Sequence, residues 1–560
     1  MRPRHLAVAL AVVLAATATS LDVGGASATP TAASDVGPAP ASPETASDRA
    51  NATFVAAYPN PVERDDEGEF VVVRFPSATN TTGWTLTDGT NAARLPNRTL
   101  SGTVALTRSP GVTASKTDHP VVAVEGRLGL ANGGERLRLR GPARTVDEAR
   151  YRDAPEAELR DFMRGGWRPL GATDREPVHT TGGRATAFVL PDAPDQVLET
   201  LGTADERLLL AGYTLSSERV TDALLEARDR GATVRVVLDG SPVGGMTDRQ
   251  GRQLDRLADA GVDVRLFAGP YTRYAHHHPK YAVVDDRALV LTENFKPAGT
   301  GGMASRGWGV TLSDPAAADA LADLHATDRT ARAATPWTEF RTGRTFEPAD
   351  PALGDYPSRH DPAQVSVASA AVLVGPDHAA DAVVARLDAA DDRVLVQQVT
   401  VDSRDNRLLR AALRAADRGV RVRLLLSSGW YVEEDNAALA AWLNRRADAE
   451  GWDLEALVDD PDGYEKLHSK GVVVDDTALV GSLNWGAASQ TDNREVVLAL
   501  AGGEAADYYA DVFAGDWAGP SARSLPTALL GVAGVAIAAA ALLARRIEIG
   551  GRDGGVGWRP

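Results

Sequence analysis

The pattern of apolar and polar positions divides the chain into segments of different periodicity. From about residue 52 to 151, short alternating or β-rich runs are separated by Gly, Asn, Asp and Pro. This pattern predicts a β-sandwich. In 185–329 and again in 364–520, short apolar runs alternate with segments whose apolar residues recur at helical spacing. The alternation predicts a mixed, helix-covered β-sheet in each of these two segments.

The two α/β segments match each other along their length. Asp229-Arg230-Gly231 and Asp417-Arg418-Gly419 lie 188 residues apart, each after an amphipathic helical run. We expect both Gly residues to end helices and not to form phosphate loops. Duplication is the simplest interpretation. Residues 152–184 are predicted to be a connector with a short helix near Ala154–Met163, and residues 330–363 are predicted to join the halves.

A matching pair of segments carries the candidate chemistry. HHHPKYAVVDDRALVLTENF (276–295) and KLHSKGVVVDDTALVGSLNW (466–485) share His-x-Lys-x4-Asp, followed by an Asn nine residues after the Asp. The first copy comprises His278, Lys280, Asp285 and Asn294, and the second comprises His468, Lys470, Asp475 and Asn484. Residues two apart in an extended strand share a face, so the His and Lys of each copy should emerge together.

Composition strengthens this interpretation of the motif. The chain has only five lysines (116, 280, 296, 466 and 470) among 59 basic residues, and two of the five occupy the pattern. A compact ammonium beside a neutral imidazole suits a phosphate oxygen next to a nucleophile. Either copy alone could be an ordinary strand with a histidine. Two copies with the same trailing Asn favour a catalytic site.

These segments resemble the paired HKD motifs of the phospholipase D superfamily. The resemblance extends to Gly481-Ser482-x-Asn484-Trp485 and to Asn493-Arg494-Glu495. The first half departs from it, with Leu291-Thr292 and Ser305-Arg306-Gly307 at the corresponding positions. The orienting Glu of the family is thus absent from its usual position in the first half. We therefore expect Glu495 to support the second histidine, His468.

The resemblance implies a duplicated α/β fold with mixed sheets and a covalent phosphohistidine on His278, with His468 protonating the leaving oxygen. The residues themselves suggest one shared site, in which a phosphodiester lies between a nucleophile and a proton donor. The candidate catalytic residues are His278, Lys280, Asp285, His468, Lys470 and Asp475. The candidate substrate-binding residues are Asn294, Ser482, Asn484 and Glu495.

Not all of these residues are expected to touch substrate. Asp285 and Asp475 lie a strand's length from the histidines and should hold the turn of the motif. His276 and His277 miss the motif spacing and are expected to form a loop. Apart from the run 276–278 no cluster has the spacing of metal ligands, so we predict neither a metal nor a cofactor and expect activity to survive EDTA.

The first β-rich segment resembles a lamin-tail domain, which implies an immunoglobulin-like fold. The resemblance rests on short motifs in the family's order and covers about one hundred residues. These motifs are Tyr58-Pro59-Asn60-Pro61, Gly68-Glu69-Phe70-Val71, Gly83-Trp84-x-Leu86-x-Asp88, Leu130-Ala131-Asn132-Gly133-Gly134-Glu135 and Val146-Asp147 through Tyr151. Trp84 is expected to be a core anchor.

The two ends of the chain carry targeting patterns. Residues 1–28 are typical of a signal peptide, and 29–51 has the composition of a linker. Residues 525–544 form an uncharged run of twenty, followed by Arg545-Arg546. We predict a single transmembrane helix, with 545–560 in the cytoplasm and the catalytic domains outside the cell membrane. A buried hairpin helix is the alternative.

Charge and cysteine content bound the remaining choices. The chain has no Cys and a net charge of −17, and its Asp-rich, Arg-over-Lys balance resembles that of halophilic archaeal proteins. Net acidity offers no polycationic face for nucleic acid. Three functions stay open: a phosphodiesterase acting on phospholipid head groups, an exported membrane-anchored nuclease, and an adhesion or binding protein with an inactive catalytic pair. The oligomeric state is left open.

Overall fold

The structure is a computed structural model, and it describes residues 52–61, 63–268 and 273–519. The predicted signal peptide and the predicted membrane span at 525–544 lie outside the described residues. Among the described residues, no helix combines the length and the apolar character needed to cross a membrane.

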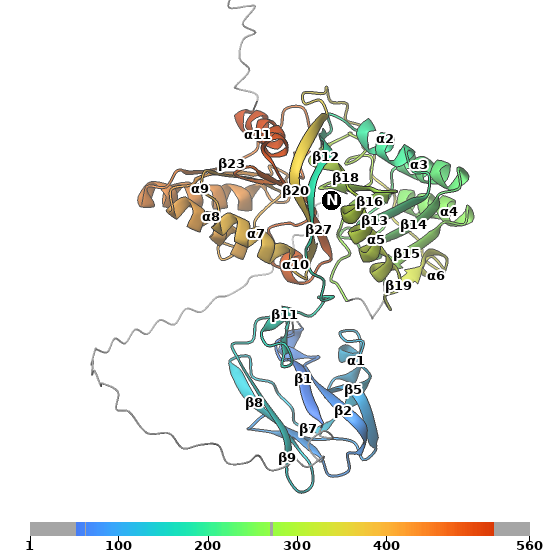
Figure 1. The fold of residues 1–560 in the computed structure, drawn as a ribbon, viewed down its shortest axis with the longest axis vertical. Coiled ribbons are helices and arrows are strands. Elements are labelled where there is room, and N and C mark those ends of the chain that lie inside the picture. Colours follow the sequence, from blue (N-terminus) through green and yellow to red (C-terminus); the bar gives the residue numbers. More distant parts are fainter. Residues whose placement is uncertain (1–51, 62, 269–272, 520–560) are drawn as a thin grey trace, which may run out of the picture. The chain divides into compact units, whose positions relative to one another are not determined.

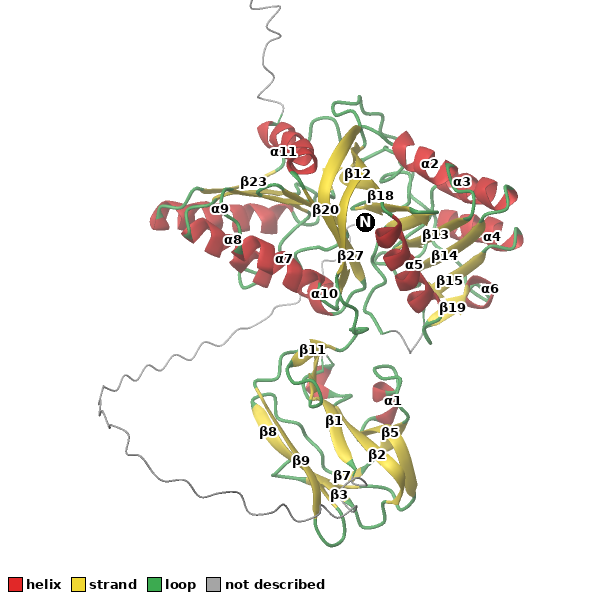
Figure 2. Ribbon diagram, in the orientation of Figure 1, coloured by secondary structure: helices red, strands yellow, loops and turns green. Residues whose placement is uncertain are grey.

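Residues 53–169 form two sheets that share one core (Figure 2). Strands such as GERLRLR alternate, so Leu137 and Leu139 point inward while Arg140 is exposed. Phe54 and Val71 of the first sheet join them in the core. The first sheet has the order β11-β10-β1-β2-β5-β6, with β1 Thr53–Tyr58, β2 Phe70–Asn80, β5 Thr99–Thr107, β6 Val121–Ala123, β10 Glu158–Asp161 and β11 Trp167–Pro169. The second has the order β7-β4-β3-β8-β9, with β3 Thr85–Thr87, β4 Ala92–Arg94, β7 Glu125–Gly126, β8 Gly134–Arg140 and β9 Thr145–Arg152.

The helix predicted near Ala154–Met163 is wrong. Strand β10 occupies that segment, and its residues pair with β1 through Ala56↔Asp161 and Ala57↔Arg160. Leu159 and Asp161 are buried while their neighbours are half-buried. This is the period of a strand, and pairing to an existing sheet edge outweighs the weak helical pattern of so short a segment.

The α/β region is built on a single sheet of 16 strands among the described residues. The first half contains β12 Val178–Leu190, α2 Asp195–Gly202, β13 Arg207–Gly212, α3 Glu218–Asp229, β14 Thr233–Asp239, α4 Asp248–Asp259, β15 Asp263–Phe267, β16 Tyr281–Val284, β17 Arg287–Leu291, β18 Ser305–Ser313 and α5 Pro315–Arg329, followed by β19 Ala334–Pro336 and α6 Trp337–Phe340. The second half contains β20 Ala363–Gly375, α7 Ala379–Asp388, β21 Arg393–Gln398, α8 Arg407–Asp417, β22 Arg421–Leu426, α9 Glu433–Glu450, β23 Leu454–Val458, β24 Lys466–Leu467, β25 Val472–Val474, β26 Thr477–Gly481, α10 Ala487–Thr491, β27 Glu495–Ala501 and α11 Gly503–Ala518.

The strand order reads the same from either end. The first half runs β15-β14-β13-β16-β17-β18-β12 and the second runs β20-β27-β26-β25-β21-β22-β23, with β12 and β20 antiparallel at the centre. The duplicated sequence therefore gives two halves related by a pseudo-twofold axis. Both Gly231 and Gly419 adopt positive φ just after α3 and α8, as expected for residues that end helices.

Helices cover both faces of the sheet (Figure 1). The first-half helices α2 to α4 pack on one cluster, and α7 to α9 pack on its second-half equivalent. Helices α5 and α11 bury Leu321, Leu324, Tyr509 and Phe513 in a central cluster to which strands of both halves contribute. The halves consequently share a core, and the motif segments meet where the halves join.

Candidate active site

Each motif histidine is fixed by backbone bonds to the opposite half. The His278 N–H donates to the Arg494 carbonyl at 3.0 Å, and the His468 N–H donates to the Arg306 carbonyl at 3.0 Å. The parallel pairing of β18 with β24 and the bridge between His277 and Arg494 are further backbone contacts between the two halves. The structure thus brings both motifs into one site, as the sequence predicted.

The first histidine pairs with a carboxylate from the second half. His278 Nδ1 lies 3.0 Å from both carboxylate oxygens of Glu495, which is fully buried. The Ser482 hydroxyl donates to the same carboxylate and accepts from the Val496 N–H. Placing Glu495 beside His468, as expected above, is therefore wrong. The strand crossing carries each downstream segment to the histidine of the other half.

The second histidine has a carboxylate that the sequence interpretation missed. His468 Nδ1 lies 3.0 Å from Glu293 Oε1, and Glu293 is fully buried. Glu293 stands at the position of Leu483 in the other half, whereas the equivalent of Glu495 is Gly307. A Cβ atom on Gly307 would lie 2.2 Å from Glu293 Cγ. The carboxylate has moved to another position in sequence and fills the space that the glycine leaves.

A sequence signal for Glu293 exists. Glu293 lies two residues after the apolar strand that ends at Leu291, and an acidic residue that is buried at such a place almost always has a partner. The presence of Glu293 together with Gly307, at the position where the second half has Glu495, could have indicated that Glu293 takes the place of the missing carboxylate.

The two motif lysines stand behind their histidines. Lys280 Nζ donates to the His278 carbonyl and Lys470 Nζ donates to the His468 carbonyl, both at 2.6 Å. Both lysines are nearly inaccessible, at 1% and 4% exposure. Burial lowers the pKa of Lys470 to about 8, opposed by Glu293 and Glu495, and it lowers the pKa of Lys280 as well.

The two imidazole–carboxylate pairs differ in proton affinity. Burial lowers the pKa of His278 to about 4, and burial with three nearby lysines lowers the pKa of His468 well below its usual value. Burial alone would raise the pKa of Glu495, but His278 and Lys280 bring it below its usual value. Burial raises the pKa of Glu293 to about 7 despite four nearby lysines. Near neutral pH the first pair is therefore a neutral imidazole on a carboxylate, while the second holds an additional proton in part of the molecules.

The motif aspartates hold backbone turns. Asp285, at φ 49°, accepts hydrogen bonds from the N–H groups of Asp205, Glu206 and Arg207. Asp475, at φ 50°, accepts from the equivalent N–H groups of residues 391–393. Because these bonds engage the carboxylates at the far end of the motif strands, we assign both aspartates a structural role. This agrees with the expectation that both aspartates hold the turn of the motif, and their place among the catalytic candidates is corrected accordingly.

Ser482, Asn294 and Asn484 occupy different environments. The Ser482 hydroxyl is fully buried and engaged with Glu495, so neither of these two side chains is free to contact substrate. This corrects their placement among the substrate-binding candidates. Asn294 is 5% exposed and its Oδ1 has no hydrogen-bond partner in the described residues. Asn484 is half-buried. The two asparagines remain candidates for contacting a phosphate.

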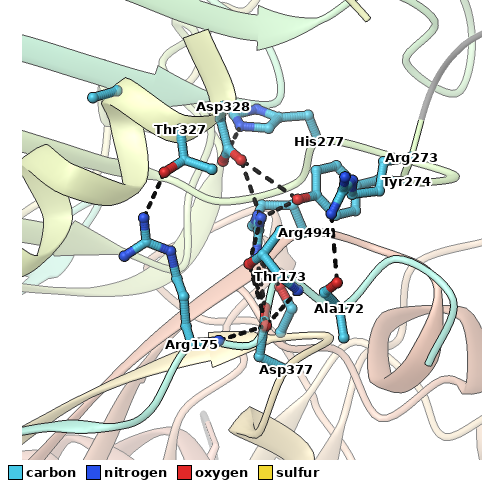
Figure 3. A network of polar contacts seen from close by, with 12 residues as sticks. Ala172, Thr173, Arg175, Arg273, Tyr274, His277, Thr327, Asp328, Asp377 and Arg494 are labelled. Atoms are coloured by element: carbon cyan, nitrogen blue, oxygen red, sulfur yellow. Dashed lines mark hydrogen bonds and ion pairs between the residues drawn. The ribbon is translucent and has the colours of Figure 1, made fainter. Parts of the chain in front are cut away.

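An arginine clasp that occurs in both halves locks them around the site, and Figure 3 shows the copy centred on Arg494. Arg494 forms ion pairs with Asp328 of the first half at 3.1 Å and Asp377 of its own half at 2.9 Å, and it also bonds to the Tyr274 hydroxyl. The symmetry-related Arg306 pairs with Asp192 and Asp516 and lies over the Tyr464 ring. Both arginines are fully buried.

The clasp also includes the histidine before the motif. His277 Nε2 lies 3.2 Å from the Asp328 carboxylate, and its ring stacks on Phe267 with centroids 4.7 Å apart. His277 is therefore packed in the framework and does not face a substrate. Among the described residues no group of three or more His, Cys, Asp or Glu side chains could hold a metal ion.

Comparison with known proteins finds a family that is similar to parts of both α/β halves. Residues 197–317 and 383–517 match the family model described as cardiolipin synthase, PLD-like domain. Within these two segments the chain is therefore similar to a PLD-like domain, and the structure there is a mixed α/β fold. The resemblance of the first β-rich segment to a lamin-tail domain stays a prediction.

Individual relatives are distant. A mitochondrial cardiolipin hydrolase from Chlamydomonas reinhardtii is 29% identical over 125 residues, which are 22% of this chain and 52% of that protein. This chain thus spans about half the length of the curated relative that it matches. The solved phosphatidylserine synthase of Haemophilus influenzae Rd KW20 is 14% identical, with 58% of this chain and 84% of that chain covered and a TM-score of 0.45. The phospholipase D family member Nuc from Salmonella typhimurium is 19% identical, with 29% and 98% covered and a TM-score of 0.24.

Proposed function

We propose that the protein is a phosphodiesterase of phospholipase D type that hydrolyses or transfers phospholipid head groups. The observation that carries the proposal is the pair of imidazoles, each on its own buried carboxylate, held in one site with two buried lysines. Such an arrangement supplies a nucleophile and a proton donor to opposite sides of one phosphorus atom. Neither step requires a metal or a cofactor.

The difference between the pairs assigns the roles. The neutral His278 donates a hydrogen bond from its Nδ1–H group to Glu495, so the lone pair on Nε2 is available to attack phosphorus. The P–O bond to the leaving group breaks, and the leaving oxygen takes a proton from the His468–Glu293 pair. Water or an alcohol then loses a proton to that pair and attacks phosphorus, the P–N bond breaks, and His278 is freed. Lys280 and Lys470 stabilise the charge on the phosphoryl oxygens.

Exposed apolar side chains beside the site favour a lipid substrate. Val243 and Trp430 are 82% and 89% exposed and belong to equivalent loops after β14 and β22. The Val243 N–H donates to the Tyr213 hydroxyl, and the Tyr213 ring contacts the His278 ring with centroids 4.8 Å apart. Exposed aliphatic and indole groups at the entrance of a polar site suit the surface of a bilayer.

An exported nuclease is the second candidate. One pocket has Pro297 in its lining together with four arginines, namely Arg219, Arg249, Arg252 and Arg256. A phosphate backbone could follow such a pocket. Three of the four arginines are ion-paired with aspartates, however, which reduces the charge available to nucleic acid. A binding protein with an inactive pair is less well supported, because both histidine–carboxylate pairs are intact.

The proposal includes location. On the sequence patterns alone, the protein is exported and anchored in the cell membrane by residues 525–544, with the catalytic domains outside. This would hold the site close to its lipid substrate. Protease accessibility of intact cells, compared with a variant that lacks 525–544, tests the anchor.

Purified protein assayed on phospholipid vesicles, single-stranded DNA and bis-p-nitrophenyl phosphate tests the substrate class. We expect head-group release from vesicles that His278→Ala and His468→Ala each abolish. Trp430→Ser should weaken vesicle hydrolysis while leaving bis-p-nitrophenyl phosphate hydrolysis intact. Hydrolysis of DNA but not of lipid would replace the first candidate with the second.

A further inference from the structure

Four of the five lysines of the chain gather around one carboxylate. Lys280, Lys296, Lys466 and Lys470 all act on the ionisation of Glu293. The proposed mechanism uses only Lys280 and Lys470. The other two are left without a role, in a chain that otherwise uses arginine for nearly all of its positive charge.

Both of these lysines project from elements that build the second half-site. Lys466, His468 and Lys470 are spaced by two along one extended segment, so their side chains share a face. Lys466 lies on β24, opposite Ser305 of β18. Lys296 begins the loop that closes over Glu293, since a Cβ atom on Gly299 of that loop would lie 2.8 Å from Glu293 Oε2.

The two ammonium groups have no carboxylate within ion-pair distance among the described residues. Both side chains are half-buried. Burial lowers the pKa of Lys296, Glu293 opposes this shift, and the nearby Lys466 adds to the lowering. Holding two like charges together in a partly desolvated place is unfavourable unless an anion neutralises them.

The lysine pair occurs on one side of the site only. The positions related to Lys296 and Lys466 by the internal duplication are Gly486 and His276. His276 lies 3.7 Å from Asp239, so its charge is already matched. The asymmetry places the additional positive charge beside His468 and away from His278.

We propose that Lys296 and Lys466 bind a second phosphate, carried by the leaving group of the substrate. The inference rests on the proposed function, in which His468 protonates the leaving oxygen. A leaving group departs on the side of its proton donor, and the lysine pair lies on that side. The preferred substrate is then a phospholipid whose head group itself bears a phosphate.

Two lipids that differ by that phosphate alone provide the test. Hydrolysis of phosphatidylglycerol releases glycerol and hydrolysis of phosphatidylglycerophosphate releases glycerol phosphate, and both reactions leave phosphatidic acid. In nonionic micelles we expect the full-length enzyme to prefer phosphatidylglycerophosphate by about ten- to a hundredfold in kcat/KM, the range of one charge-assisted hydrogen bond. Lys296→Gln combined with Lys466→Gln should reduce this ratio to near one.

Two controls distinguish a binding role from a structural one. Lys296→Arg combined with Lys466→Arg keeps the charges and should keep most of the preference. Lys116→Gln removes the fifth lysine, which pairs with Glu63 in the β-sandwich, and should leave the ratio unchanged. If the wild type has equal kcat/KM values for the two lipids, or if the double Gln variant keeps the wild-type preference, the second-phosphate site alone is overturned.

The same comparison with dithymidylate, with and without a terminal phosphate, separates a lipid source from a nucleotide source. A lysine-dependent preference in the lipid pair supports the inference as stated. The same preference in the nucleotide pair only would overturn the lipid assignment. Failure of the wild type to hydrolyse either lipid would overturn the proposed function and this inference with it.

Discussion

The second half-site carries its carboxylate at position 293 and has Gly at position 307, where the internal duplication would place a Glu. Moving the carboxylate from 293 to 307 gives the sharpest test of the site. If Glu293 holds His468 as Glu495 holds His278, then moving the carboxylate to position 307 should rebuild the second half-site on the pattern of the first. The perturbation is the double variant Glu293→Ala with Gly307→Glu, compared with each single change.

The single changes should fail for different reasons. Glu293→Ala removes a charge-assisted hydrogen bond worth about 1.5–3 kcal/mol, which corresponds to a loss of about 10- to 150-fold in kcat. Gly307→Glu forces a Cβ to 2.2 Å from Glu293 Cγ and 2.7 Å from Glu293 Oε1. Overpacking of this kind costs about 1–3 kcal/mol in the free energy of unfolding, and two carboxylates would compete for one imidazole.

The double variant removes the clash, because the three atoms nearest to that Cβ all belong to the Glu293 side chain beyond its Cβ. A partner for the new carboxylate is also in place. The Thr292 hydroxyl accepts from the Trp308 N–H, just as the Ser482 hydroxyl accepts from the Val496 N–H. The Thr292 hydroxyl can therefore donate its hydrogen to the carboxylate introduced at position 307, as the Ser482 hydroxyl does to Glu495.

We expect the double variant to exceed both single variants in kcat, with a coupling free energy of at least about 1.4 kcal/mol, or tenfold. Steady-state kinetics on bis-p-nitrophenyl phosphate, with thermal unfolding of all four proteins, measures the coupling. Additive losses in a folded double variant would refute the equivalence of the two carboxylates.

Four further results are expected. Enzyme quenched in alkaline denaturant should carry its phosphoryl group on His278, and phosphate mapped to His468 would reverse the proposed roles. The pH profile of kcat/KM should rise as His278 loses a proton near pH 4 and fall as the His468–Glu293 pair loses one near pH 7. Glu293→Gln should move the descending limb to lower pH, whereas Glu495→Gln should leave that limb in place. Asp285→Ala should cost about 1–3 kcal/mol in the free energy of unfolding by chemical denaturation while kcat stays near the wild-type value, because three backbone N–H groups lose their acceptor. Dialysis against EDTA should leave the rate unchanged, and loss of activity restored by Zn²⁺ would contradict the metal-free chemistry.

The sequence by itself determined the duplication and the motif residues, and it pointed to the class of chemistry that we propose. These are local features: His278 and Lys280 share a face because of strand geometry, and the repetition of the pattern is visible without coordinates. The β/α alternation likewise followed from periodicity. Segments too short for periodicity were less secure, and the residues of β10 were wrongly predicted to be helical.

Only the tertiary structure decided which carboxylate serves which histidine. Glu495 follows His468 by 27 residues, and proximity in sequence suggested that they act together. The crossing of the two halves brings Glu495 to His278, 217 residues away, and Glu293 to His468, 175 residues away. Contacts at such separations depend on how β12 and β20 join the sheet. Local propensity carries no information about that join, so the partners of the two histidines became visible only in the folded chain.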